Sequence, residues 1–122
     1  MGRSAGRDIL TRSKAFATAA IRAVRALPSD VASRQVARQL VRSATSVGAN
    51  LHEADMADTV PDFCSKVNIA QKEAAEAAYW ASLIREAGIT LTDDIVRIEA
   101  EATELQKICR QVVFASRQGG AK

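Results

Sequence analysis

Apolar residues recur along this chain at alternating spacings of three and four positions, which is the period of an amphipathic helix. Three stripes of this kind follow one another through the middle and the end of the chain. Their members are, in order, Ser33, Val36, Leu40, Ala44, Val47, Leu51 and Ala54; Phe63, Val67, Ala70, Ala74, Ala77, Ala81 and Ile84; and Ile95, Ile98, Ala102, Leu105, Cys109 and Val112. No strand-like alternation of useful length interrupts them. The pattern predicts an all-α protein.

Helix-breaking and capping residues divide the chain into four helical segments. Pro28 ends the first, because the residue before a proline is driven out of the helical conformation. Either Ser29 or Asp30 can cap the second segment. Pro61 suits the first turn of the third, and Gly88 ends it. We therefore predict one antiparallel up-and-down four-helix bundle domain over 1–122, with helices over about 8–26, 30–56, 61–87 and 93–117 and a flexible tail over 118–122.

Two features of the predicted helices concern packing. Gly48 lies inside the second helix, where glycine costs about 1 kcal/mol relative to alanine, so we expect another backbone to pack close to it. A second feature is a surplus of apolar residues off the main stripes, which a single four-helix core cannot easily cover. These residues are Val41, Ile69, Tyr79, Trp80, Leu83, Val96, Ile108, Val113 and Phe114. The surplus predicts a homo-oligomer.

Composition narrows the class of protein. The chain has 122 residues, of which 48% are hydrophobic and 25% charged, as in ordinary globular proteins. It has no run of about 20 apolar residues for a membrane span, and no apolar run follows the basic N-terminus as in a secretory signal. Cys64 and Cys109 both lie on apolar helical faces, which predicts buried thiols in a reducing compartment. These observations predict a cytoplasmic protein.

The net charge of +3 conceals a strong segregation of charge along the chain. Residues 1–42 hold nine basic and two acidic residues, whereas residues 43–104 hold four basic and twelve acidic residues. Residues 105–122 hold four basic residues and no acidic ones. Such segregation can steer a polyanion to one surface, or it can dock opposite regions of two copies of the chain. A solvated surface on which the charges happen to cluster is the third interpretation.

Basic residues spaced by four form a line on the second predicted helix, and others lie at the end of the first helix, where the two helices meet. The line fits the phosphate backbone of RNA or DNA, and the lack of interleaved aromatic residues predicts little sequence specificity. The candidate nucleic-acid-binding residues are Lys14, Arg22, Arg25, Arg34, Arg38 and Arg42. A solvated face or a face paired at an interface is the alternative, and Lys107, Arg110 and Arg117 offer a second basic surface.

The residues that enzymes and metal sites require are missing. The one histidine, His52, belongs to no Glu-x-x-His pair, and Met56 stands where the second histidine of a zinc protease motif would be. We expect His52 to be a polar helix-face residue, with no cofactor or metal bound. Glu73 and Glu76 are adjacent on one helical face and could form an acid–base pair. Ion pairs with basic residues of a neighbouring helix or subunit explain them better, so we predict that the chain is not an enzyme.

The second and third predicted helices resemble a known family. The resemblance rests on the run RSATSVGANLHEA over Arg42–Ala54, and on a following set of residues: Asp62-Phe63, Lys66, Ile69–Ala74, Glu76 and Tyr79-Trp80. This pattern is similar to the four-helix bundle proteins encoded in intervening sequences of bacterial 23S ribosomal RNA, to which the accessory proteins of diversity-generating retroelements are related. The resemblance covers about Phe16 to Ile89. It implies a ring-shaped homopentamer with a basic surface for RNA or DNA and no established enzymatic activity. The alternative function is a homo-oligomeric scaffold whose charges serve assembly.

Overall fold

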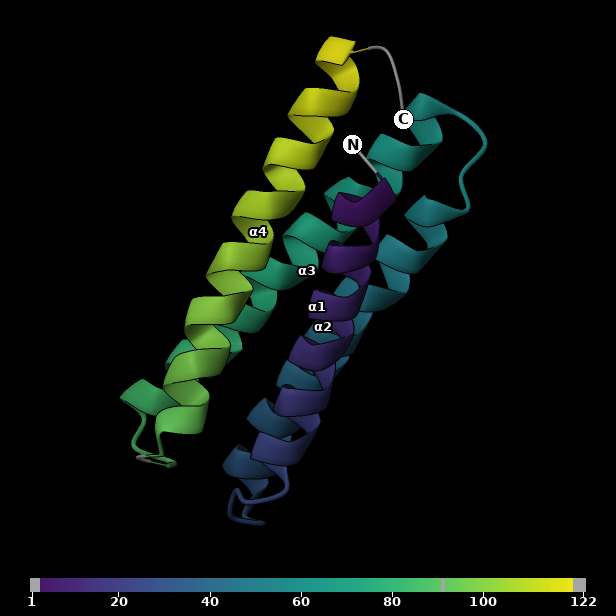
Figure 1. Ribbon diagram of the computed structural model, residues 1–122. Helices are drawn as coiled ribbons and strands as arrows, with labels where there is room; N and C mark the ends of the chain where they lie inside the picture. The colour runs from purple at the N-terminus through teal and green to yellow at the C-terminus, as the bar shows by residue number, and fades with distance from the viewer. Residues whose placement is uncertain (1–2, 91, 120–122) are drawn as a thin grey trace.

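Helices make up nearly all of the computed structural model, which describes residues 3–90 and 92–119. Figure 1 shows them running up and down beside one another, joined by short connections. They are α1 (Arg3–Val24), α2 (Val31–Asp55), α3 (Val60–Glu86) and α4 (Asp93–Gly119). Within the described ranges no residue belongs to a strand. The predicted all-α four-helix bundle is therefore confirmed.

The outer boundaries of the first and last helices differ from the predicted ones. α1 begins at Arg3 rather than at position 8, because no proline stops the helix there and the single Gly6 costs only about 1 kcal/mol. α4 continues to Gly119, so the first two residues of the predicted flexible tail, 118–122, are helical. The rest of that tail lies outside the described residues. The sequence pattern places apolar faces reliably, but it does not say how far an exposed helix end continues.

The connection between α1 and α2 explains why α1 ends at Val24 rather than at position 26. The backbone amides of Ala26 and Leu27 each donate to the carbonyl oxygen three residues back, at 3.2 and 3.1 Å. These bonds close a tight turn instead of continuing the α-helix. Pro28 follows directly, and its ring disfavours the helical conformation at Leu27.

Local hydrogen bonds and one glycine fix the start of α2 and both ends of α3. Asp30 is the cap of α2, because its Oδ1 accepts from the Ser33 amide at 3.0 Å; Ser29 does not serve this role. At the start of α3, Thr59 accepts from the Asp62 amide at 3.2 Å. Gly88 ends that helix with a φ of 70°, in the left-handed region that favours glycine. The amide of Ile89 then reaches back to a carbonyl oxygen in the last turn of the helix, which completes a common helix stop.

The three predicted apolar stripes face the core. Every member of the stripes on α3 and α4 is buried, and so are all members on α2 except Val36, which is partly exposed. Alanines fill the middle of α3, where Ala70, Ala74 and Ala77 have no exposed surface at all. Gly48 lies against α1, because a Cβ atom there would be 3.2 Å from Ser13 Oγ. The expected close approach at Gly48 is therefore confirmed.

The four helices surround the core unequally. α3 packs extensively against both α2 and α4, and α1 packs against α2, whereas α1 and α4 make the least extensive contact of these four neighbouring pairs. In Figure 1, the α1–α2 and α3–α4 connections lie at one end of the bundle and the α2–α3 connection lies at the other. None of the described helices combines the length and the apolarity that a membrane span requires. The weakly packed α1–α4 seam is the least closed side of the bundle.

Apolar residues off the stripes divide into three groups. Val113 is buried within the bundle, so it needs no oligomer to cover it. The partly exposed ones are Val41, Trp80, Leu83 and Ile108. Four remain exposed on α3 and α4, namely Ile69, Tyr79, Val96 and Phe114, with exposed fractions of 39 to 66%. The number of apolar residues that the bundle leaves uncovered is thus smaller than the sequence predicted. The exposed ones among them lie on the hairpin of α3 and α4.

Candidate nucleic-acid interface

Ion pairs join the helices across their seams. Arg12 of α1 donates from two nitrogens to the two carboxylate oxygens of Glu101 on α4, at 2.6 and 2.8 Å. These hydrogen bonds hold the pKa of Arg12 above its usual value. Arg85 of α3 binds Glu99 of α4 in the same two-pronged manner, at 2.9 and 3.1 Å. The oppositely charged regions of the sequence therefore meet, in part, within one copy of the chain.

Arg42 differs from the other five predicted residues, because it is paired with carboxylates of a neighbouring helix. Its guanidinium group donates to both carboxylate oxygens of Glu73 on α3, at 3.2 and 3.3 Å, and also contacts Glu76. Steps of four residues advance about 40° beyond a full turn of an α-helix, so a line of such residues drifts around the helix. From Arg34 to Arg42 this drift carries the line from the outer surface to the α2–α3 seam. Arg42 is therefore an interhelical residue, and its charge is already neutralised.

A small polar network surrounds the same carboxylates. Ser46 Oγ donates to Glu73 Oε2 at 3.1 Å, and Asn50 Nδ2 donates to the Ser46 carbonyl oxygen at 2.9 Å. Both oxygens of Glu73 thus have partners on α2. The interpretation of Glu73 and Glu76 as partners of a basic residue on a neighbouring helix is confirmed, and the basic residue is Arg42. An acid–base role would require breaking these contacts first.

The other five candidate residues form what we call the α1–α2 basic face: Lys14, Arg22, Arg25, Arg34 and Arg38. All five side chains are exposed, and among the described residues none has a carboxylate within ion-pair distance. Arg22 and Arg25 lie in and just after the last turn of α1, and Arg34 and Arg38 lie in the first turns of α2. Because the two helices are joined over residues 25–30, these four charges share one end of the bundle.

A second set of cations lies on α4. Lys107, Arg110 and Arg117 are exposed, and no carboxylate of the described chain pairs with them. Arg117 also borders a depression that is lined mainly by the first turns of α3. The alternative basic surface predicted from the sequence is thus present as well, with three charges instead of five.

The two cysteines and the histidine have structural environments that explain them without a catalytic role. Cys64 and Cys109 are free and buried, as predicted, and burial raises the pKa of the Cys109 thiol to about 11. His52 lies on the exposed face of α2, and its Nδ1 is 2.8 Å from the Gly48 carbonyl oxygen. Within the described part of the chain, no three acidic, histidine or cysteine residues are grouped so as to hold a metal ion.

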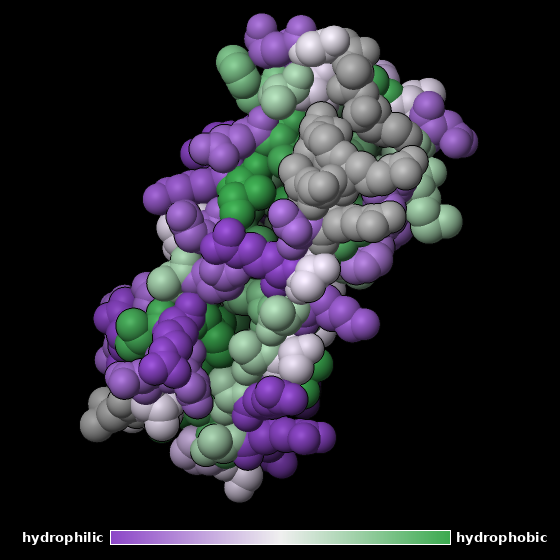
Figure 2. All heavy atoms as spheres, viewed as in Figure 1, coloured by the Kyte–Doolittle hydropathy of each residue, from purple (hydrophilic) through white to green (hydrophobic). Residues whose placement is uncertain are grey.

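A groove between α1 and α4 was missed by the sequence analysis. It has a volume of about 460 Å³. Its lining includes Ala15, Ala19 and Ala23, which are spaced by four along α1, and it also includes Ile98 from α4. Figure 2 shows apolar side chains along the seam between these helices, with hydrophilic side chains on both sides. The alanine spacing was a usable signal, but the second wall comes from the far end of the sequence.

Comparisons with known proteins agree with this fold. The chain matches the 23S rRNA-intervening sequence protein family over residues 7–111. A solved structure of a protein of unknown function from the S23 ribosomal protein family of Bacteroides thetaiotaomicron is similar, with a TM-score of 0.77 and 29% sequence identity. The similarity covers 86% of this chain and 97% of that chain. No match was found among curated proteins. Because the family match spans most of the chain, this protein belongs to the 23S rRNA-intervening sequence protein family.

Proposed function

We propose that this chain is a non-enzymatic cytoplasmic protein that binds the phosphate backbone of nucleic acid through the α1–α2 basic face. The observation that carries the proposal is a contrast between two kinds of arginine. Arg12, Arg42 and Arg85 lie at the helix seams and are paired with glutamates. The five cations of the basic face are exposed and lack such partners in the described chain, so their charge is available to an outside anion.

The α1–α2 basic face favours binding through phosphate contacts rather than through recognition of the bases. The exposed aromatic residues Tyr79 and Phe114 lie on α3 and α4, and among the described residues no exposed aromatic side chain lies on α1 or α2. Bases therefore have no aromatic platform to stack on beside these cations. Contacts to phosphate position a protein on nucleic acid but carry no sequence information directly. The family description names 23S rRNA, which makes RNA the first ligand to test.

A salt titration tests the proposal. Affinity for a generic duplex RNA and for a duplex DNA of equal length would be measured by fluorescence anisotropy at several salt concentrations. We expect log affinity to fall linearly with log salt, and the double variant Arg34→Gln/Arg38→Gln to flatten the slope by about 0.7 to 0.9 per lost contact. The RNA and DNA titrations, compared with each other, identify the preferred ligand.

The matched control is the double variant Lys107→Gln/Arg110→Gln on α4, which removes the same charge from another exposed surface. It should leave the slope of the parent protein unchanged. The proposal is wrong if the parent protein does not bind at low salt. The assignment of the surface is wrong if the α4 variant flattens the slope and the α2 variant does not.

A homo-oligomeric scaffold is the second candidate function, and exposed apolar side chains favour it. Ile69, Tyr79, Val96 and Phe114 leave a set of large apolar groups on the α3–α4 hairpin. Docking of this surface on a different surface of the next copy would close a ring, and the family resemblance implies five copies. Sedimentation equilibrium at micromolar concentration tests this assembly. A stable monomer would contradict it.

A further inference from the structure

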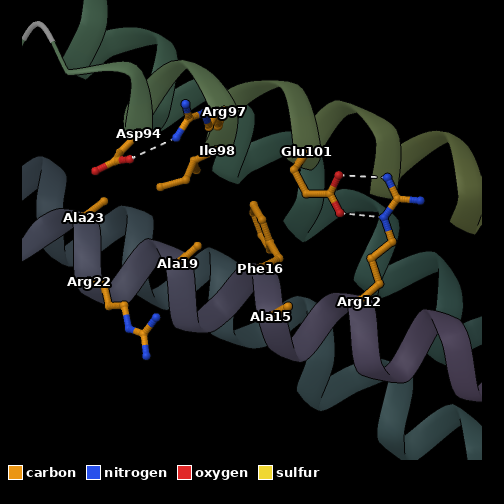
Figure 3. A pocket seen from close by; sticks show the side chains of 10 residues that line it. All are labelled: Arg12, Ala15, Phe16, Ala19, Arg22, Ala23, Asp94, Arg97, Ile98 and Glu101. Atoms are coloured by element: carbon orange, nitrogen blue, oxygen red, sulfur yellow. Dashed lines mark hydrogen bonds and ion pairs between the residues drawn. The ribbon is translucent and has the colours of Figure 1, made fainter.

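The groove between α1 and α4 has the size and the lining of a small-molecule site. Its volume of about 460 Å³ lies within the range of about 300 to 1,000 Å³ that is usual for ligand pockets. Phe16 and Ile98, each only 3% exposed, form an apolar floor that the core holds in place. In Figure 3, these two side chains point toward each other's helices between the backbones of α1 and α4. Gaps between the helices of bundles are a common place for such sites.

Charged side chains surround this apolar floor. At one end, the ion pair of Arg12 and Glu101 bridges the two helices, as Figure 3 shows. At the other end, Asp94 and Arg97 form a loose pair at 3.7 Å, in which both side chains are mostly exposed. Arg22 lies at the rim of the groove, where Figure 3 shows its side chain directed away from α4, and it has no carboxylate partner within the described residues. The five charged groups therefore carry one net positive charge, which belongs to the unpaired Arg22.

We propose that the α1–α4 groove binds a small amphiphilic molecule with an apolar body and a single anionic group. The apolar body would lie against Phe16, Ala19 and Ile98, and the anionic group would pair with Arg22. Such a ligand removes the remaining apolar surface of the groove from water and supplies the counter-charge that Arg22 lacks. This inference goes beyond nucleic-acid binding, although Arg22 borders both surfaces.

Two probes separate the apolar contribution from the ionic one. 8-Anilinonaphthalene-1-sulfonate has a fused aromatic body and one sulfonate, and its fluorescence rises on binding. N-Phenyl-1-naphthylamine has nearly the same body without a charge. We expect the sulfonate to bind one site per chain, and Arg22→Gln to weaken it by about fivefold or more, as loss of a charged hydrogen bond does. Binding of the neutral probe should stay within about twofold of the parent value.

Filling the groove tests its location. Ala19 is exposed in the groove wall, so Ala19→Trp occupies the space without changing the core. We expect this variant to weaken both probes more than about tenfold. Thr18→Trp is the control, because Thr18 is exposed on the same helix but does not line the groove. Circular dichroism and thermal unfolding check that both variants fold.

Three results would overturn the proposal. The first is equal binding of the sulfonate probe to Ala19→Trp and Thr18→Trp, because the probe would then bind elsewhere. The second is no effect of Arg22→Gln on the sulfonate, since the groove would then have no preference for an anion. The third is a lower mass of Ala19→Trp in sedimentation, because a second copy of the chain would then be the occupant of the groove.

Discussion

Arg42 on α2 and Glu73 on α3 form a two-pronged ion pair, with nitrogen–oxygen distances of 3.2 and 3.3 Å. The same guanidinium group contacts Glu76, and its Nε donates to the side chain of Gln39 at 3.4 Å. One arginine thereby contacts two glutamates that lie three residues apart on the same face of α3, and the cluster keeps one net negative charge. This arrangement assigns Arg42 to the stability of the bundle.

We predict that Arg42→Gln lowers the free energy of unfolding by about 1 kcal/mol, because Glu73 and Glu76 lose their shared cation and repel each other. The effect stays small because the Arg42 side chain is about half exposed, so that water screens the pair. Urea unfolding measures it, and the difference from the parent should shrink at high salt. The salt dependence of RNA binding should not change. A flatter salt slope of RNA binding in Arg42→Gln would contradict this prediction, because it would show that Arg42 contacts phosphate.

A second prediction concerns the crossing of α1 and α2 at Gly48. A Cβ atom there would already lie 3.2 Å from Ser13 Oγ, so Gly48→Leu should force the two helices apart. We expect it to destabilise the protein by about 1 to 3 kcal/mol, although leucine is the better helix former. Ala49→Leu is the control, because Ala49 is exposed on the same helix. Equal unfolding midpoints for the two variants would show that the helices do not pack closely there.

A third prediction concerns pH and the buried thiol of Cys109, whose pKa is raised to about 11 by burial. The pKa is higher in the folded than in the unfolded state, so deprotonation favours unfolding. The protonated thiol contributes fully below about pH 9, and that contribution is lost as the pH rises toward 11. Relative to Cys109→Ala, the parent should lose about 2 kcal/mol of stability over this range, measured by urea unfolding at each pH. A constant difference between the two proteins would contradict the burial of this thiol.

The sequence by itself determined the helices and the face that each one turns to the core. The apolar stripes of α3 and α4 are buried in full, since a period near 3.6 residues places such positions on one side of a helix. Asp30 and Gly88 act at helix ends through bonds within a few residues of themselves, and such local signals are readable from consecutive positions. The exposure of Arg34 and Arg38 could be predicted for the same reason, because both lie off the buried stripe of α2.

Tertiary structure alone decided which neighbour each side chain meets. Arg42 and Glu73 are 31 positions apart in the sequence, and Arg12 and Glu101 are 89 apart. Periodicity gives the position of a residue around its own helix axis, but the helix that lies on that side depends on how all four are arranged about the core. The α1–α4 groove has the same origin. Its walls come from opposite ends of the chain, and it exists because α1 packs less extensively against α4 than against α2.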